Sequence, residues 1–147
     1  EAKHYIESYL AHYSGVDSYM KNVVEKANAD GYVETMFGRR RNLPELTSSK
    51  HMIRAFGERV ARNMPIQGTA ADIIKIAMIK VDERMKAENL RARLVLQVHD
   101  ELIVEAPQDE SMRVALIVQE EMENAVKMSV PLTADAAIGR TWYDAKG

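Results

Sequence analysis

The sequence contains no cysteine, and it has only four prolines and seven glycines in 147 residues. The absence of cysteine excludes disulfide bonds, thiolate metal sites and a cysteine nucleophile. No apolar run approaches the roughly 20 residues that a membrane-spanning helix needs, so we expect no membrane partner. The first residues lack the basic leader and apolar stretch of a signal peptide, and no methionine begins the chain. We therefore expect a piece of a longer protein.

The sequence also lacks a phosphate-binding loop, a dinucleotide glycine fingerprint, a zinc-spaced cluster and a nucleophile elbow. Its composition is that of a globular protein, with 46% hydrophobic and 29% charged residues. The net charge of −2 is unevenly spread: Arg39 to Arg62 carries a net +5, and Asp100 to the end carries a net −6. This pattern is compatible with a polyanion site beside a cation site, and equally with a solvated loop and a solvated helix face.

Helical spacing of apolar residues predicts three long helical regions. Residues 1–30 form the first, divided near Ser14-Gly15, and its tyrosines are expected in a buried seam rather than as stacking surfaces: Tyr5, Tyr9, Tyr13 and Tyr19. Pro65 splits the second, from Met52 to Lys86, into a helix ending near Asn63 and another beginning near Pro65. The third covers residues 109–127, with Asp109 as cap and an inward face of Met112, Leu116, Met122 and Val126.

Strand signals are shorter. Asp30-Gly31 predicts a turn before a strand over residues 32–36, and residues 38–50 are expected to be a basic loop. Residues 93–98 and 101–105 are two strand-like runs separated only by His99 and Asp100, and such a two-residue gap predicts a tight hairpin. We expect a last strand from Leu132 to Ile138. The predicted fold is α+β, with helices packed on a small antiparallel sheet.

Three segments carry candidate chemistry. At the hairpin tip, His99 precedes two adjacent carboxylates, Asp100 and Glu101. Crowded carboxylates repel each other unless a cation lies between them, and such oxygen ligands suit Mg²⁺. Taken alone, Asp100 can equally be a plain turn residue with Glu101 facing water.

The second segment is the row formed by Arg59, Asn63 and Gln67, each four residues after the last, beside the small residues 68–71. Arginine pairs with phosphates and amides reach base edges, although a solvated helix face explains the row equally well in isolation. The third segment is Gly38 followed by Arg39, Arg40 and Arg41, which can grip phosphates or simply be solvated.

Taken together, these segments resemble the C-terminal end of the bacterial enzymes of DNA polymerase family A. The similarity is carried by residues 31–35 with Gly38-Arg39-Arg40, by Glu58-Arg59 through residues 67–73, by residues 97–102, and by the closing residues 141–144. The order and spacing of the Gln67-Gly68-Thr69 and Val98-His99-Asp100-Glu101 motifs are highly specific. Nearly the whole chain takes part in the resemblance.

The resemblance implies roles for these residues. Asp100 resembles a metal-binding aspartate of the polymerase palm, and Glu101 resembles the auxiliary carboxylate beside it. Arg59, Asn63, Gln67 and His99 resemble residues that hold primer–template DNA, and Arg39 and Arg40 are expected to contact DNA as well. Family members use two Mg²⁺ ions to join a primer 3′-hydroxyl to an incoming deoxynucleotide. A bacterial, cytoplasmic and nucleoid-associated role in DNA replication and repair is implied.

The resemblance also implies what lies elsewhere. The family's other metal aspartate and its nucleotide-binding fingers helix, which would bind deoxynucleoside triphosphates, have no match here. Residues 1–50 then correspond to the end of the fingers with the basic loop, and residues 51–147 to part of the palm. We expect the isolated chain to be inactive, with an exposed sheet edge that favours dimerisation. The alternatives are a stand-alone, non-catalytic module that binds duplex DNA and, more distantly, a divergent metal-dependent nuclease.

Overall fold

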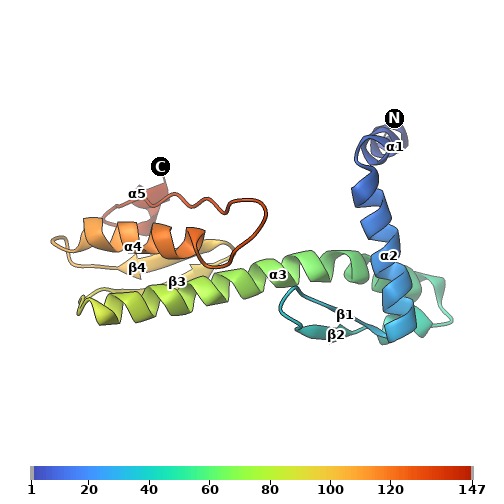
Figure 1. Ribbon diagram of the computed structural model, residues 1–147, viewed down its shortest axis with the longest axis horizontal. Helices are drawn as coiled ribbons and strands as arrows, with labels where there is room; N and C mark the ends of the chain where they lie inside the picture. Colours follow the sequence, from blue (N-terminus) through green and yellow to red (C-terminus); the bar gives the residue numbers. More distant parts are fainter. Residues whose placement is uncertain (1, 147) are drawn as a thin grey trace. The chain divides into compact units, whose positions relative to one another are not determined.

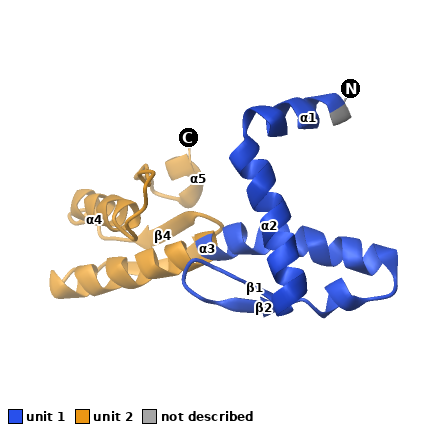
Figure 2. Cartoon of the chain, turned by 45° about the vertical axis from the view of Figure 1, so that its right-hand side comes forward, with its two compact units in different colours: residues 1–69 blue, residues 70–147 orange. Residues whose placement is uncertain are grey.

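The computed structural model describes residues 2–146, which form two compact units that divide between Thr69 and Ala70 and are coloured separately in Figure 2. The first contains α1 (Ala2–His12), α2 (Ser14–Asp30), β1 (Tyr32–Glu34), β2 (Arg40–Asn42), the 3-10 helix η1 (Pro44–Thr47) and the first half of α3 (His51–Ala87). The second contains the rest of α3, β3 (Arg93–Val98), β4 (Glu101–Glu105), α4 (Ser111–Glu123) and α5 (Trp142–Lys146) (Figure 1).

The predicted α+β class is confirmed: helices accompany two small antiparallel sheets of two strands each. The division of residues 1–30 into two helices is also confirmed, since α1 ends at His12 and α2 begins at Ser14. Gly31 ends α2 in the left-handed conformation, with φ of 78°, and its N–H donates to the carbonyl of Ala27. A glycine adopts this conformation without the steric penalty of a side chain, so the predicted Asp30-Gly31 turn is present.

The core of the first unit lies where α2, the β1–β2 hairpin, η1 and α3 meet. Its buried members are Ala27, Val33, Leu43, Leu46 and Ala61. Strand β1 pairs antiparallel with β2, with Val33 opposite Arg41. The predicted strand at 32–36 is therefore present but shorter, and the expected basic loop at 38–50 contains both β2 and η1. Arg40 explains part of this order, because it pairs with Glu34 at 3.2 Å across the hairpin and lies 4.4 Å from the Tyr32 ring.

Helix α3 corrects a prediction, because it runs unbroken through Pro65. A proline inside a helix removes one backbone hydrogen bond and costs about 3 kcal/mol. Packing outweighs that cost here: Ala61 is fully buried and Met64 packs against the first core. Pro65 itself lines a cavity of about 290 Å³ whose other walls come from α2 and β1.

The second unit packs α4 and the second half of α3 against the β3–β4 hairpin. Its buried members are Val81, Met85, Val114 and Ile117, and Leu94, Leu102 and Val104 of the hairpin pack against them. The inward face expected for this helix is wrong at Met112, which is 76% exposed, and at Leu116, which is 45% exposed, whereas Met122 and Val126 are half-buried. Nor does Asp109 cap the helix, since the N-cap is Glu110 without a side-chain capping bond. Two apolar stripes occur on this helix, and packing selects the one through Val114 and Ile117.

Two further expectations are wrong. Residues 132–138 form no strand, because no other strand of the described chain pairs with them; the N–H of Ala134 donates instead to the Glu123 carboxylate at 3.2 Å. The tyrosines of the first two helices are not buried within this chain, as Tyr5 is 70% exposed and Tyr9 53% exposed. Over residues 2–146, no helix is both long and apolar enough to cross a bilayer.

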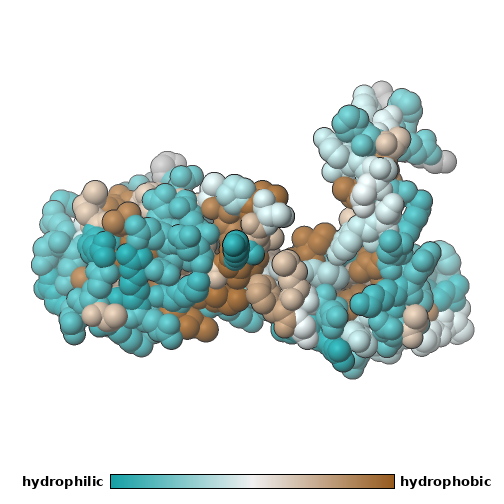
Figure 3. Space-filling model, viewed as in Figure 1, coloured by the Kyte–Doolittle hydropathy of each residue, from teal (hydrophilic) through white to brown (hydrophobic). Residues whose placement is uncertain are grey.

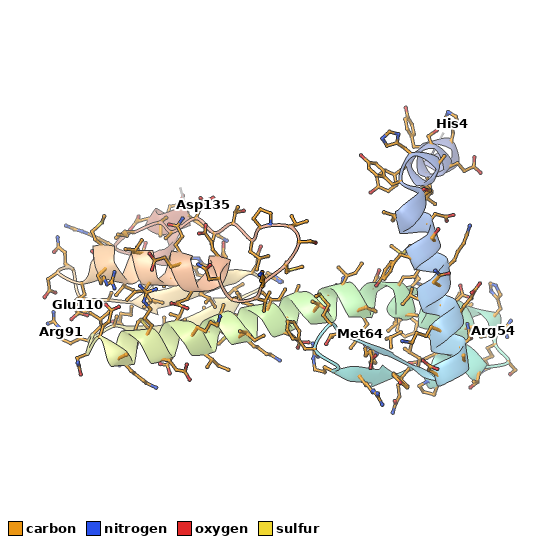
Figure 4. The ribbon with its side chains drawn as sticks, viewed as in Figure 1. His4, Arg54, Met64, Arg91, Glu110 and Asp135 are labelled. Carbon is orange, nitrogen blue, oxygen red and sulfur yellow. The ribbon has the colours of Figure 1, made fainter. Side chains whose placement is uncertain are left out.

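Ion pairs tie the elements of the second unit together. Arg113 of α4 donates twice to Glu88, which follows α3, at 2.6 and 2.7 Å. Arg84 of α3 reaches Glu120 at 2.7 Å and Glu121 at 2.8 Å on α4. Arg91, before β3, pairs with Glu110 at 2.8 Å, and the two side chains lie together at one end of this unit in Figure 4. These pairs link α3, α4 and the segments that precede β3 and α4.

Candidate functional site

The α3 face carries three of the predicted site residues within the first unit. Because the helix continues past Pro65, Gln67 extends the row begun by Arg59 and Asn63. All three side chains are exposed, and neither amide makes a hydrogen bond within the described residues. The Arg59 guanidinium lies 5.8 Å from the Phe56 ring, which orients it without neutralising its charge. The row therefore presents one cation and two free amides to an external ligand.

The neighbouring Arg62 differs from Arg59 in one respect. Its guanidinium pairs with Glu58 at 3.2 Å, so the local charge of this pair is close to zero. Within the described residues, Arg59 has no carboxylate partner, whereas Arg62 has one. This contrast makes Arg62 a natural control for Arg59.

The loop between β1 and β2 is held against α3 by small polar groups. The N–H of Met36 donates to Thr69 Oγ1 at 3.0 Å, and Arg39 Nη2 donates to the carbonyl of Gly68 at 2.9 Å. Thr35 Oγ1 accepts from the N–H of Arg39 at 3.2 Å. Gly68 permits this contact, because a Cβ there would lie 2.7 Å from Thr35 Cγ2. The absence of a side chain at Gly68 therefore lets the β1–β2 loop approach α3 closely.

The hydrogen bonds between the β1–β2 loop and α3 also involve the arginines that are expected to bind phosphate. The Arg39 guanidinium donates a hydrogen bond to the Gly68 carbonyl, and Arg40 is paired with Glu34. Arg41 lies on the same strand, is exposed, and has no ion pair within the described residues. Sequence reasoning missed Thr69 as the residue that anchors the loop, because it appears only as one of several small side chains.

The hairpin tip in the second unit has the two-residue turn that was predicted. Val98 pairs with Glu101, so His99 and Asp100 form the turn. His99 has a φ of 53°, in the left-handed region that favours glycine. A side chain in this region costs about 1–3 kcal/mol, and such strain gathers at functional sites. The Gln97 side-chain amide donates to the His99 carbonyl at 2.5 Å and helps to hold the turn.

The two carboxylates at the tip have different environments. Asp100 is exposed and makes no hydrogen bond or ion pair within the described residues. Glu101 Oε1 lies 3.3 Å from Lys146 Nζ. The register places Glu101 and Ile103 on one face of the hairpin, opposite the core face of Leu102 and Val104. Lys146 was not foreseen, because 45 residues separate it from Glu101.

The donor set fits a divalent cation in part. Adjacent exposed carboxylates supply the hard oxygen ligands of Mg²⁺, which usually takes one or two protein carboxylates. Among residues 2–146 there is no group of three or more histidine or acidic side chains that could hold a metal. Asp100 and Glu101 can therefore hold an ion only with further ligands, such as water or substrate phosphates.

Comparison with known proteins identifies the class to which this fold and these motifs belong. The model of DNA polymerase family A matches residues 1–144, and the chain belongs to this family. It is 54% identical over 146 residues to DNA polymerase I of Bacillus caldotenax and 52% identical to that of Bacillus subtilis. These matches cover 99% of this chain and 17% of each relative.

A solved structure agrees. It is described as the POL domain of Pol1 from M. smegmatis in complex with DNA primer-template and dNTP. This chain matches it with a TM-score of 0.95 and 48% identity, covering all of this chain and 26% of that one. The family resemblance and the fold expected from it are thus confirmed, whereas the chain spans about a sixth of the length of the curated relatives it matches.

Proposed function

We propose that this chain supplies part of the polymerising site of a template-directed DNA polymerase acting in DNA replication and repair. The observation that carries the proposal is the hairpin tip, where a strained His99 precedes Asp100, an exposed carboxylate free of partners in the described chain. Family membership over residues 1–144 supports it. So does the solved relative, whose description includes primer-template DNA and dNTP.

The proposed roles follow from the two units. In the first, Arg59 contacts a phosphate while the Asn63 and Gln67 amides reach groove acceptors of the duplex. Arg39 and Arg40 lie on the loop and strand beside this face, and for Arg40 a backbone phosphate would take the place of its present partner Glu34. In the second, His99 contacts the primer–template, and Asp100 and Glu101 bind divalent cation. The basic, amide and histidine side chains thus position the DNA, and the two carboxylates provide negative charge for a bound cation.

The reaction would join the primer 3′-oxygen to the α-phosphorus of a deoxynucleoside triphosphate. The bond between that phosphorus and the bridging oxygen breaks, pyrophosphate leaves, and the hydroxyl proton is released. Two bound Mg²⁺ ions would supply charge neutralisation and activation of the hydroxyl in such chemistry. This chain's contribution is the Asp100 and Glu101 carboxylates. We place the activity in the bacterial cytoplasm, on the nucleoid, where its DNA substrate lies.

DNA binding is tested on the chain itself by fluorescence anisotropy with a labelled primer–template duplex. We expect Arg59→Ala to weaken binding about fivefold, because a phosphate contact is lost. Arg62→Ala is the matched control and should change affinity less than about twofold, since Arg62 is already paired with Glu58. Equal losses in both variants would show that only overall charge matters and would contradict the proposed face.

Catalysis is tested in a chimera in which this chain replaces the matching segment of the Bacillus subtilis relative. We expect Mg²⁺-dependent primer extension by the chimera, none by the chain alone, and a loss of at least about a hundredfold in Asp100→Ala. Duplex binding should survive that substitution. If the chain is instead a stand-alone binding module, the chimera should show no Mg²⁺-dependent extension although the chain still binds duplex DNA.

A further inference from the structure

Lys146, on α5, contacts the hairpin tip from outside the hairpin. Its Nζ lies 3.3 Å from Glu101 Oε1. Both side chains remain partly open to solvent, with 58% of the Lys146 side chain and 39% of the Glu101 side chain exposed. A surface ion pair of this kind contributes little to stability. Its main effect is to place a positive charge beside the Glu101 carboxylate.

Contacts other than the ion pair with Glu101 also position the Lys146 side chain. Its ammonium lies 5.1 Å from the centre of the Trp142 ring, one turn earlier on α5. The start of α5 is fixed by reciprocal bonds: Thr141 N–H and Oγ1 donate to Asp144 Oδ2 at 3.1 and 2.8 Å, and Asp144 N–H donates to Thr141 Oγ1 at 3.2 Å. A capped helix and an aromatic face thus hold the ammonium beside Glu101.

The two carboxylates at the tip are consequently unequal. Asp100 has no protein partner in the described chain, whereas Glu101 already has a cation beside it. A divalent ion can approach Asp100 without displacing a protein group. To take up Glu101 as well, it must share that carboxylate with a positive charge or push the charge away.

We propose that Lys146 is a positioning residue and an internal counter-cation for Glu101. It holds the Glu101 carboxylate in place and reduces the affinity of the hairpin tip for divalent cation. The proposal rests on the proposed role of Asp100 and Glu101 in cation binding. It deepens that role by separating the two carboxylates: Asp100 is the open ligand, and Glu101 is the one whose availability Lys146 sets.

The test uses the chain as it is and Mn²⁺ as the probe. Paramagnetic broadening of the backbone amides of residues 99–101 in ¹⁵N-resolved spectra gives a dissociation constant without any catalytic assay. Lys146→Met keeps the apolar stem of the side chain but removes its charge. We expect it to bind Mn²⁺ about three- to tenfold more tightly, because a repelling cation has gone.

Two further variants establish that position matters and not only charge. Lys146→Arg restores a cation beside Glu101 and should bind Mn²⁺ within about twofold of the unsubstituted chain. Lys86→Met removes the same charge from another exposed lysine of this unit, one that pairs with Asp82 at 2.6 Å. It should leave Mn²⁺ affinity unchanged within about twofold, since salt screens an exposed charge that does not contact Glu101.

The Mn²⁺ affinities of these variants distinguish the proposal from its alternatives. Tighter binding in Lys146→Met that is abolished in an E101Q background supports the proposal, because the effect then runs through Glu101. Equal binding in Lys146→Met and the unsubstituted chain overturns the proposal but leaves cation binding at the tip intact. The same gain in Lys86→Met also overturns it, as a mere charge effect. Absence of broadening at residues 99–101 in every variant contradicts both this proposal and the cation role of the hairpin.

Discussion

Single atoms decide how closely the β1–β2 loop can approach α3. Gly68 has a neighbour, Thr35 Cγ2, that would lie 2.7 Å from any added Cβ, closer than two non-bonded carbon atoms can lie. The same approach lets the N–H of Met36 reach Thr69 Oγ1 and the Arg39 guanidinium reach the Gly68 carbonyl. A helix glycine is normally a weakness, so its presence here is explained by contact between backbone and side chain.

We therefore expect Gly68→Ala to lower the free energy of unfolding by about 1–2 kcal/mol, despite the better helix propensity of alanine. Urea denaturation followed by circular dichroism measures the change. Gly15→Ala is the matched control, since nothing lies within 4 Å of its added Cβ, and it should be neutral or slightly stabilising. In a Thr35→Ser background the loss should shrink, because the clashing methyl has gone while the hydroxyl remains. A loss that persists there would contradict the steric explanation.

At the scale of elements, α3 is the least expected feature of the fold. Pro65 leaves the carbonyl of Ala61 without its usual helical donor, yet the helix runs from His51 to Ala87. The Pro65 ring also lines the cavity beside α2 and β1 and so contributes some packing. The helix is thus maintained by its buried face and not by local propensity at this position.

Pro65→Ala should accordingly raise the free energy of unfolding by about 1–2 kcal/mol, less than the full cost of an interior proline because some ring packing is lost. Native-state hydrogen exchange is the measurement, since the substitution introduces a backbone amide whose protection reports the new hydrogen bond. Pro107→Ala, in the segment after β4, should leave the protection of α3 unchanged. Lower stability in Pro65→Ala would mean that packing of the proline ring stabilises the fold more than the restored hydrogen bond does.

The ion pair between Glu88, which follows α3, and Arg113 of α4 should make the stability of the second unit depend on pH. The hydrogen bond from Arg113, followed by its charge, lowers the pKa of Glu88 below the ordinary 4.5. A lowered pKa in the folded state stabilises the fold above the unfolded value, and this stabilisation disappears as pH falls through the folded value. The pair should therefore be fully effective at neutral pH and absent in acid.

Glu88→Gln should unfold at lower urea than the unsubstituted chain at pH 7, and the difference should vanish as pH falls well below the ordinary pKa of 4.5. Urea midpoints measured from neutral pH to about pH 3 supply the comparison. Glu83→Gln, which removes an exposed carboxylate without an ion pair in the described chain, should show no such convergence. Parallel curves for Glu88→Gln and the unsubstituted chain would contradict the shifted pKa.

The β3–β4 hairpin was predictable because its signals are local: two apolar strand-like runs, a two-residue gap and a carboxylate at the turn. The first helices and the Gly31 turn were predictable for the same reason. The strand expected over residues 132–138 failed because a strand needs a partner, which no local pattern supplies. The hydrogen bond from Met36 to Thr69 and the ion pair between Lys146 and Glu101 were missed because each joins residues far apart in the sequence. The roles of Arg59, Asn63, Gln67 and Asp100 remain predictions for the experiments above.

At the scale of the whole molecule, the two compact units divide at residue 69, whereas the fingers and palm portions expected from the family resemblance divide at residue 50. That functional division stays a prediction, because compactness and subdomain identity are different properties. The proposed DNA-holding row of α3 belongs to the first unit and the carboxylates belong to the second. Hydrophilic residues, drawn in teal, dominate the surface of each unit in Figure 3, and brown apolar patches interrupt them.

One apolar area belongs to the hairpin of the second unit. Leu96 is 47% exposed and lies opposite Ile103, on the face away from the core. The sheet has only two strands, so each has one edge without a strand partner in the described chain. Unpaired edges with apolar side chains recruit other chains, and charged residues on such edges prevent it. The predicted self-association of this chain should therefore begin at the hairpin.

Leu96→Lys should reduce that association, because an edge strand that carries a charge resists pairing with a second copy. Sedimentation velocity at rising protein concentration measures it: we expect the average sedimentation coefficient to increase with concentration in the unsubstituted chain and to stay constant in Leu96→Lys. Met112→Lys adds the same charge at a 76% exposed apolar residue of α4 and should associate like the unsubstituted chain. If Met112→Lys also becomes monomeric, net charge controls association and the strand edge does not. If the unsubstituted chain is monomeric throughout, the open edge has no consequence for assembly, and the exposed Leu96 side chain remains in contact with water.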